Sequence, residues 1–199
     1  MRTVYAAGWQ VFPEWAYDYD RLIRLAHTNS MLVYAWFEFP YVNEKFWLEH
    51  PEWREKNALG EDAVIGWRKP MAMGDPACFR AVKRETGDLL QSYDWDGVVV
   101  NRLGWEGPHG VEVPESYTPF HPTVCSNYAG RYGYDPMALF DADSVHYWKK
   151  NPGALGRFEA YRRSLAEKWV GEILAWLTHM AKVKHDQSGP SFSWGSFFL

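Results

Sequence analysis

A carboxylate among aromatic rings is the feature of this sequence that most suggests chemistry. Glu38 ends the run Tyr34-Ala35-Trp36-Phe37-Glu38, just before Pro40. An apolar setting raises the pKa of a carboxyl group, which is what a general acid requires. The alternative is a structural carboxylate paired with a loop arginine such as Arg68. We weigh the two roles equally, because perturbed carboxylates occur both in active sites and in structural ion pairs.

Other acidic and metal-binding side chains have simpler interpretations. Asp75 precedes Pro76 and is predicted to be a helix N-cap, and Asp96 is predicted to tie down the turn before Gly97. No histidine pair has the spacing of a metal motif, and no nucleotide-binding or nucleophile-elbow motif is present. We therefore expect no metal and no cofactor. Cys78 and Cys125 show no metal-ligand pattern and are predicted to be buried thiols.

Composition narrows the class of partner. The net charge is −4 with interspersed signs, so the chain lacks the cation density that nucleic acids or anionic membranes would need. The aromatic share is 18%, and aromatic rings form stacking platforms for sugars. We expect a carbohydrate ligand, no nucleic acid and no membrane. No signal peptide or membrane span is recognisable; if Met1 is the true start, a cytoplasmic location is the default expectation.

The apolar pattern predicts an α/β chain with parallel strands. Strands are expected at 3–7, 31–39 and 96–103, where runs such as Val98-Val99-Val100 are typical of strands buried on both faces. Helices are expected after Asp18, from Pro76 to about Tyr93, at 123–132 and 136–140, and from about Leu155 to Ala181. Residues 182–199 show no convincing pattern and are predicted to be an irregular tail.

Three segments together resemble the barrel proteins called family 10 glycosylhydrolase-like. They are Val33-Tyr34-Ala35-Trp36-Phe37-Glu38, His50-Pro51-Glu52-Trp53-Arg54 and Tyr93-Asp94-Trp95-Asp96-Gly97-Val98. Their order and spacing match over roughly residues 31–105. The resemblance implies a TIM-barrel-like (β/α) fold with a ligand site at the C-terminal ends of the strands, and a glycosidase-like role on bacterial polysaccharide.

A complete barrel needs roughly 250 residues and eight strands. We therefore predict that residues 1–181 form an incomplete barrel of three or four βα units. Open sheet edges would favour self-association.

The second catalytic acid is missing where the resemblance places it. Glycoside hydrolysis generally needs two carboxyl groups, about 5 Å apart for retention and about 6.5 to 9.5 Å apart for inversion. The strand that begins at Asp96 ends in Asn101 and Arg102, and neither can donate a proton at neutral pH. Glu106 in the following loop is the candidate replacement, so the predicted catalytic pair is Glu38 and Glu106. The predicted substrate-binding residues are Tyr34, Trp36, Trp67, Arg68, Asn101, Arg102 and Trp105.

Three hypotheses follow from the sequence. The first is a glycoside-hydrolase-like protein that acts on or binds a polysaccharide or oligosaccharide. The second is a non-catalytic carbohydrate-binding relative, in which Asn101 and Arg102 have replaced the acids. The third is an inactive barrel fragment.

Overall fold

The computed structural model describes residues 2–7, 18–107 and 109–188, and their strands form two separate sheets. Strands β1 (Arg2–Ala7), β2 (Met31–Glu38) and β5 (Gly97–Asn101) make a parallel sheet in the order β1-β2-β5. A short antiparallel pair, β3 (Tyr41–Val42) with β4 (Lys69–Pro70), lies beyond the end of β2. The predicted parallel strands are confirmed, with β2 in the middle.

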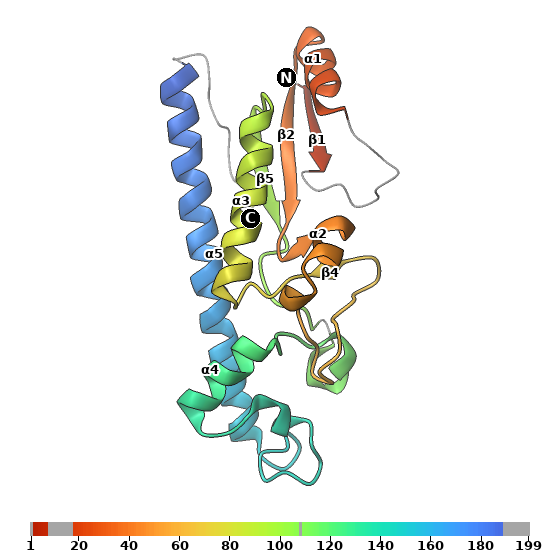
Figure 1. Cartoon of the computed structure of the whole chain (residues 1–199), viewed down its shortest axis with the longest axis vertical. Helices are drawn as coiled ribbons and strands as arrows, with labels where there is room; N and C mark the ends of the chain where they lie inside the picture. Colours follow the sequence, from red (N-terminus) through yellow and green to blue (C-terminus); the bar gives the residue numbers. More distant parts are fainter. Residues whose placement is uncertain (1, 8–17, 108, 189–199) are drawn as a thin grey trace.

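Helices and 3-10 turns connect the strands and make up most of the C-terminal half (Figure 1). In chain order they are α1 (Tyr19–Thr28), α2 (Glu44–Glu49), η1 (Pro51–Trp53), α3 (Pro76–Ser92), η2 (Gly110–Glu112), η3 (Pro114–Ser116), α4 (Pro122–Tyr132), η4 (Pro136–Leu139) and α5 (Pro152–Ser188).

The prediction of a TIM-barrel-like fold is wrong. After β5 the described chain continues through 3-10 turns and helices, and it adds no further strand to the parallel sheet. In a larger parallel sheet, another strand would cover the apolar stripe of the last helix. That stripe is instead covered by α3, the sheet and a cluster of aromatic side chains, so the described fold is mixed α/β with a helical C-terminal part.

Strand β2 is buried on one face only, which also differs from the sequence prediction. Val33, Ala35 and Phe37 are fully buried against the helices, whereas Trp36 is 37% exposed. Because side chains alternate along a strand, Glu38 shares the side of Trp36. The candidate carboxylate therefore lies on the less covered face of the sheet, at its carboxyl edge.

Two aspartates hold the sheet and its main helix in place, as the sequence predicts. Asp75 caps α3 by accepting hydrogen bonds from the backbone N–H groups of Ala77 and Cys78. Asp96 accepts from the backbone N–H of Val33 at 2.7 Å and pairs with His27 at 2.9 Å. Asp96 thus joins the entry of β5 to β2 and to α1, which is a structural role.

The side chains pack into two hydrophobic clusters that share one helix. The first cluster lies between the parallel sheet and α1, α3 and the C-terminal half of α5, where Trp169 and Ile173 are buried. The second holds residues of α4, η4 and the loops before them, with Phe158 and Tyr161 of α5. Figure 1 shows α5 running along the length of the molecule past both groups of elements.

Helix α5 continues to Ser188, beyond the predicted end at Ala181. The apolar stripe fades in that last stretch, although Lys and Gln are good helix formers, and pattern reasoning therefore ended the helix early. The rest of the predicted tail, 189–199, lies outside the described residues. Among the residues described, no helix combines the length and the hydropathy needed to cross a membrane.

The close approach of β5 to β2 yields a test of the sheet. A Cβ atom added at Gly97 would lie 2.4 Å from a ring carbon of Tyr34. We expect Gly97→Ala to lower the free energy of unfolding by about 1–3 kcal/mol, measured by urea denaturation, because the ring must move. Gly171→Ala in α5 meets no atom within 4 Å and should stabilise the protein by up to about 1 kcal/mol. Equal effects of the two substitutions would contradict the packing described for β2 and β5.

Candidate functional site

Glu38 lies between two arginines at the carboxyl edge of the parallel sheet. Arg68 donates from Nε to Glu38 Oε2 at 3.2 Å, and Arg102 Nε lies 3.8 Å from Oε1. The side chain of Glu38 is 23% exposed and that of Arg68 is 21% exposed, so solvent reaches the pair only in part. The setting is cationic, and the apolar setting predicted for Glu38 is wrong. The ion pair with Arg68 named as the structural alternative is present.

A strained turn at the end of β5 presents Arg102. Asn101 is the register partner of Glu38, and its side-chain oxygen accepts the backbone N–H of Arg102 at 2.8 Å. Arg102 has φ of 54°, in the left-handed region that costs a non-glycine residue about 1–2 kcal/mol. Non-glycine residues in that region are enriched at binding and active sites.

Arg68 is positioned by the antiparallel pair β3–β4, because it directly precedes β4. The register pairs Val42 with Lys69, and this places the preceding residue beside the end of β2. The Arg68 guanidinium lies 4.7 Å from the ring centre of Trp67 and 5.5 Å from that of Tyr41. Trp67 is 51% exposed, so a solvent-accessible ring adjoins the charged cluster.

Glu106 reaches the same region from the loop after β5. Its backbone N–H donates to the Thr118 hydroxyl at 3.0 Å, and its carbonyl accepts from Arg162 of α5. Burial raises the pKa of the Glu106 carboxyl, the charge of Glu38 raises it further, and Arg162 opposes both. The charge of Glu38 is the smallest of these three effects, and it puts the two acids selected from the sequence within electrostatic range of each other.

The remaining predicted binding residues divide into two groups. Trp36 is exposed two residues before Glu38 on the same side of β2, whereas the Tyr34 ring lies against Gly97 deeper in the sheet. Trp105 is half-buried in the first cluster, where it packs edge-on against Trp169 and donates from Nε1 to the Arg162 carbonyl at 2.8 Å. Trp36 is therefore accessible to a ligand, while Trp105 has a packing role.

Sequence reasoning missed the contributions of Arg162 and Tyr41. Arg162 donates from Nε to the carbonyl of Thr118 at 2.5 Å as well as to that of Glu106, so it holds the loop that carries the second acid. It lies within a long amphipathic helix, where a cation is ordinarily a solvated residue. Tyr41 is 4% exposed, and its hydroxyl has no hydrogen-bond partner among the described residues. Nothing in the local pattern indicated that Arg162 would hold this loop or that the Tyr41 ring would lie near the Arg68 guanidinium.

A third acid, Glu55, belongs to the loop 54–72, and its side chain is buried. Its Oε1 accepts backbone N–H groups from Lys56 at 2.9 Å, Phe120 at 3.2 Å and His121 at 2.9 Å, and its Oε2 has no partner in the described part of the chain. Burial raises the pKa of Glu55 to about 7, although the three hydrogen bonds and Arg162 act in the other direction. Glu55 therefore joins this loop to the start of α4 through a carboxyl group that titrates near neutral pH.

No group of three or more His, Cys, Asp or Glu side chains in residues 2–7, 18–107 and 109–188 is arranged to hold a metal ion. Cys78 and Cys125 are both free and buried, and burial raises their thiol pKa values, that of Cys125 to about 12. Because the thiolate is the reactive form, neither cysteine is set up as a nucleophile. The chemistry available at the sheet edge is that of carboxyl groups, guanidinium groups and aromatic rings.

Comparison with solved structures finds a distant structural similarity. No family model matches the chain, and no curated protein matches it in sequence. α-L-Fucosidase isoenzyme 2 from Paenibacillus thiaminolyticus is similar over 84% of this chain, with 15% sequence identity and a TM-score of 0.48. The chain spans 25% of that protein's length. This neighbour is a glycoside hydrolase, but the resemblance to the family 10 proteins finds no support, and a likeness this distant assigns no activity to the chain.

Glu55 gives the stability of the protein a predictable dependence on pH. Its pKa is raised from 4.5 to about 7 in the folded state, so the folded state binds a proton that the unfolded state has released between these values. The contribution to stability is complete below pH 4.5 and is lost as the pH rises through 7, by on the order of 3 kcal/mol. We expect Glu55→Gln to remove this loss, so that the variant gains stability relative to the wild type between pH 4.5 and 8 in urea denaturation.

The exposed Glu61 in the same loop provides the matched control, Glu61→Gln, which measures the effect of removing a surface charge. A stability difference between Glu55→Gln and the wild type that stays constant over this pH range would show that Glu55 is ionised throughout.

Proposed function

We propose that the edge of the sheet where β2 and β5 end binds carbohydrate, and that Glu106 and Glu38 hydrolyse a glycosidic bond there. The observation that carries the proposal is a pair of interacting carboxyl groups in contrasting settings. Glu106 is partly buried with a raised pKa, while Glu38 is paired with Arg68 and Arg102. Two carboxyl groups whose surroundings differ in this way can divide the acid and base roles between them. Ligands of open parallel α/β sheets also bind outside the carboxyl ends of the strands.

The settings favour roles opposite to those expected from the sequence. Glu106 keeps a proton to higher pH and is suited to protonate the leaving oxygen. Glu38 is held by Arg68 as the anionic partner of an ion pair, and it is suited to act as the base toward water or as the nucleophile toward the anomeric carbon.

Accessible groups around the pair suit the binding of a sugar. Trp67 and Trp36 expose ring surface that can stack on the C–H faces of a pyranose. Asn101 is exposed, and the half-exposed Arg102 offers N–H donors beyond those near Glu38. Hydroxyl groups of a sugar can accept from the guanidinium and can both donate to and accept from the amide.

A non-catalytic carbohydrate-binding function is the second candidate, and the ion pairs of Glu38 favour it. A carboxylate whose two oxygens face Arg68 and Arg102 can serve simply to hold these arginines in place. Under this alternative, oligosaccharides quench Trp fluorescence in a saturable way and no reducing ends are released.

Substitution of each acid distinguishes the proposed roles. We expect Glu106→Gln to lower kcat on an oligosaccharide by about 100-fold or more, because the leaving group then departs without a proton. The loss should be much smaller on a nitrophenyl glycoside, whose leaving group needs no protonation. Glu38→Gln should lower kcat on both substrates, and release of reducing ends and of nitrophenol provides the measurement.

Glu115→Gln is the control, because this exposed glutamate lies in the same long loop. The assignment of roles is contradicted if Glu106→Gln retains wild-type kcat on an oligosaccharide that the parent cleaves. It is also contradicted if the activated substrate needs Glu106 as strongly as the oligosaccharide does.

A further inference from the structure

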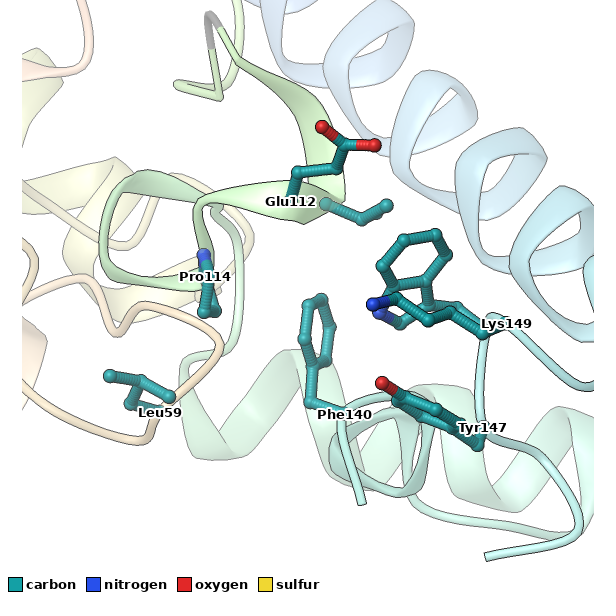
Figure 2. A pocket seen from close by; sticks show the side chains of 8 residues that line it. Leu59, Glu112, Pro114, Phe140, Tyr147 and Lys149 are labelled. Carbon is teal, nitrogen blue, oxygen red and sulfur yellow. The ribbon is translucent and has the colours of Figure 1, made fainter. Parts of the chain in front are cut away.

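A cavity in the lower part of the molecule lies away from the Glu38 edge and takes no part in the function proposed above. Its volume is about 500 Å³, within the range of small-molecule sites. Its lining comes from three separate stretches of the chain: Leu59, the segment 111–114, and the segment 140–149 (Figure 2). In Figure 2 the Phe140 ring stands between Pro114 and Tyr147, and Lys149 extends above it.

Backbone hydrogen bonds hold these three stretches together. The Ala58 N–H donates to the Pro114 carbonyl at 3.1 Å, which fixes the Leu59 wall against η3. The Trp148 N–H donates to the Leu139 carbonyl at 2.9 Å, which fixes the 147–149 wall against η4. The ring of Phe140 packs edge-on against Phe120 of the second cluster. A cavity supported in this way is preformed, so a ligand would not need to order its walls.

Polar groups of the cavity wall can serve a ligand, although the Lys149 ammonium already lies 5.1 Å from the ring centre of Trp148. Glu112 and Lys149 are both exposed, and neither forms an ion pair with any residue that the structure describes. The hydroxyl of Tyr147 and the indole N–H of Trp148 also have no hydrogen-bond partner within the described ranges. The wall therefore offers an anionic acceptor, a cationic donor, a hydroxyl and an N–H beside the rings of Phe140, Tyr147 and Trp148.

We propose that this cavity is a second carbohydrate-binding site, which takes a short neutral stretch of a glycan. The charges of Glu112 and Lys149 cancel, so a ligand with a net charge of either sign would meet one repelling group. A neutral ligand can instead use both groups, because a sugar hydroxyl can donate to Glu112 and accept from Lys149. Its ring also has apolar C–H faces that suit Tyr147 and Trp148.

The inference shares its ligand class with the proposed function, but it rests on different residues. The two sites can therefore fail separately. Trp148 lies outside both hydrophobic clusters, so its truncation should leave the fold intact. Lys149→Met is a second variant that keeps most of the length of the side chain and removes its ammonium group, with its charge and its N–H donors. The matched control for the other site is Trp67→Ala, which also removes a tryptophan ring.

The test measures binding of cellotetraose, xylotetraose, maltotetraose and chitotetraose to the full chain, by ligand-observed saturation-transfer NMR and by titration of Trp fluorescence. For at least one tetraose, we expect Trp148→Ala to raise the Kd of one binding phase about 10-fold and Lys149→Met about 3-fold. Trp67→Ala should leave that phase unchanged. Both cavity variants should hydrolyse a short nitrophenyl glycoside as the wild type does.

The possible results separate the two sites. Unchanged binding in Trp148→Ala, with binding lost in Trp67→Ala, removes the second site and leaves the proposed function standing. Binding lost only in the cavity variants supports the second site and removes carbohydrate binding from the Glu38 edge. Absence of binding by all four tetraoses contradicts both proposals, and binding of zwitterionic tyrosine in their place shows that the ligand class is wrong.

Discussion

Helix α5 contributes buried side chains to both hydrophobic clusters, and the position of the candidate site depends on this shared packing. Trp169, Ile173 and Leu177 face the first cluster, and Ala154, Phe158 and Tyr161 belong to the second. Arg162 lies between these two sets along the helix. Its guanidinium donates to the carbonyls of Thr118 and Glu106, so the helix that joins the clusters also fixes the loop that brings Glu106 toward Glu38. Loss of packing in either cluster would therefore displace α5 and, through Arg162, the loop that carries Glu106.

Unequal electrostatic surroundings then give three buried or half-buried glutamates three different roles. Glu38 has two guanidinium partners, Glu106 has burial and a neighbouring negative charge, and Glu55 has burial with three backbone N–H donors. The same side-chain type therefore occurs as a partner in ion pairs, as a carboxyl group whose pKa is raised, and as a link between a loop and α4. Burial and local charge explain these differences better than sequence neighbours do.

Local patterns predicted the elements of the fold well and their assembly poorly. Three features could be predicted from nearby residues, and the structure confirms them: the cap of α3 at Asp75, the structural role of Asp96 and the parallel strand that contains the three valines. The barrel prediction was wrong because sheet closure depends on segments far apart in sequence. The apolar stripe of α5 is covered by α3 and the sheet along one part of the helix, and by aromatic side chains of the loops and of α4 along the other. At the site, strand ends located Glu38 and Asn101. The cationic setting of Glu38 and the contacts of Arg162 arise only when distant segments meet, so the apolar setting inferred from neighbouring rings was misleading.

The most direct test of this account is a ¹³C NMR titration of the glutamate side-chain carboxyl groups in the wild type and in Glu38→Gln. The central claim is that Glu38 and Glu106 act on each other in one site. The account predicts that Glu106 titrates above the ordinary range of glutamate, and that its midpoint falls in Glu38→Gln because one of the charges that raise its pKa is gone. A Glu106 midpoint that is the same in both proteins would contradict the claim, since the two carboxyl groups would then not interact.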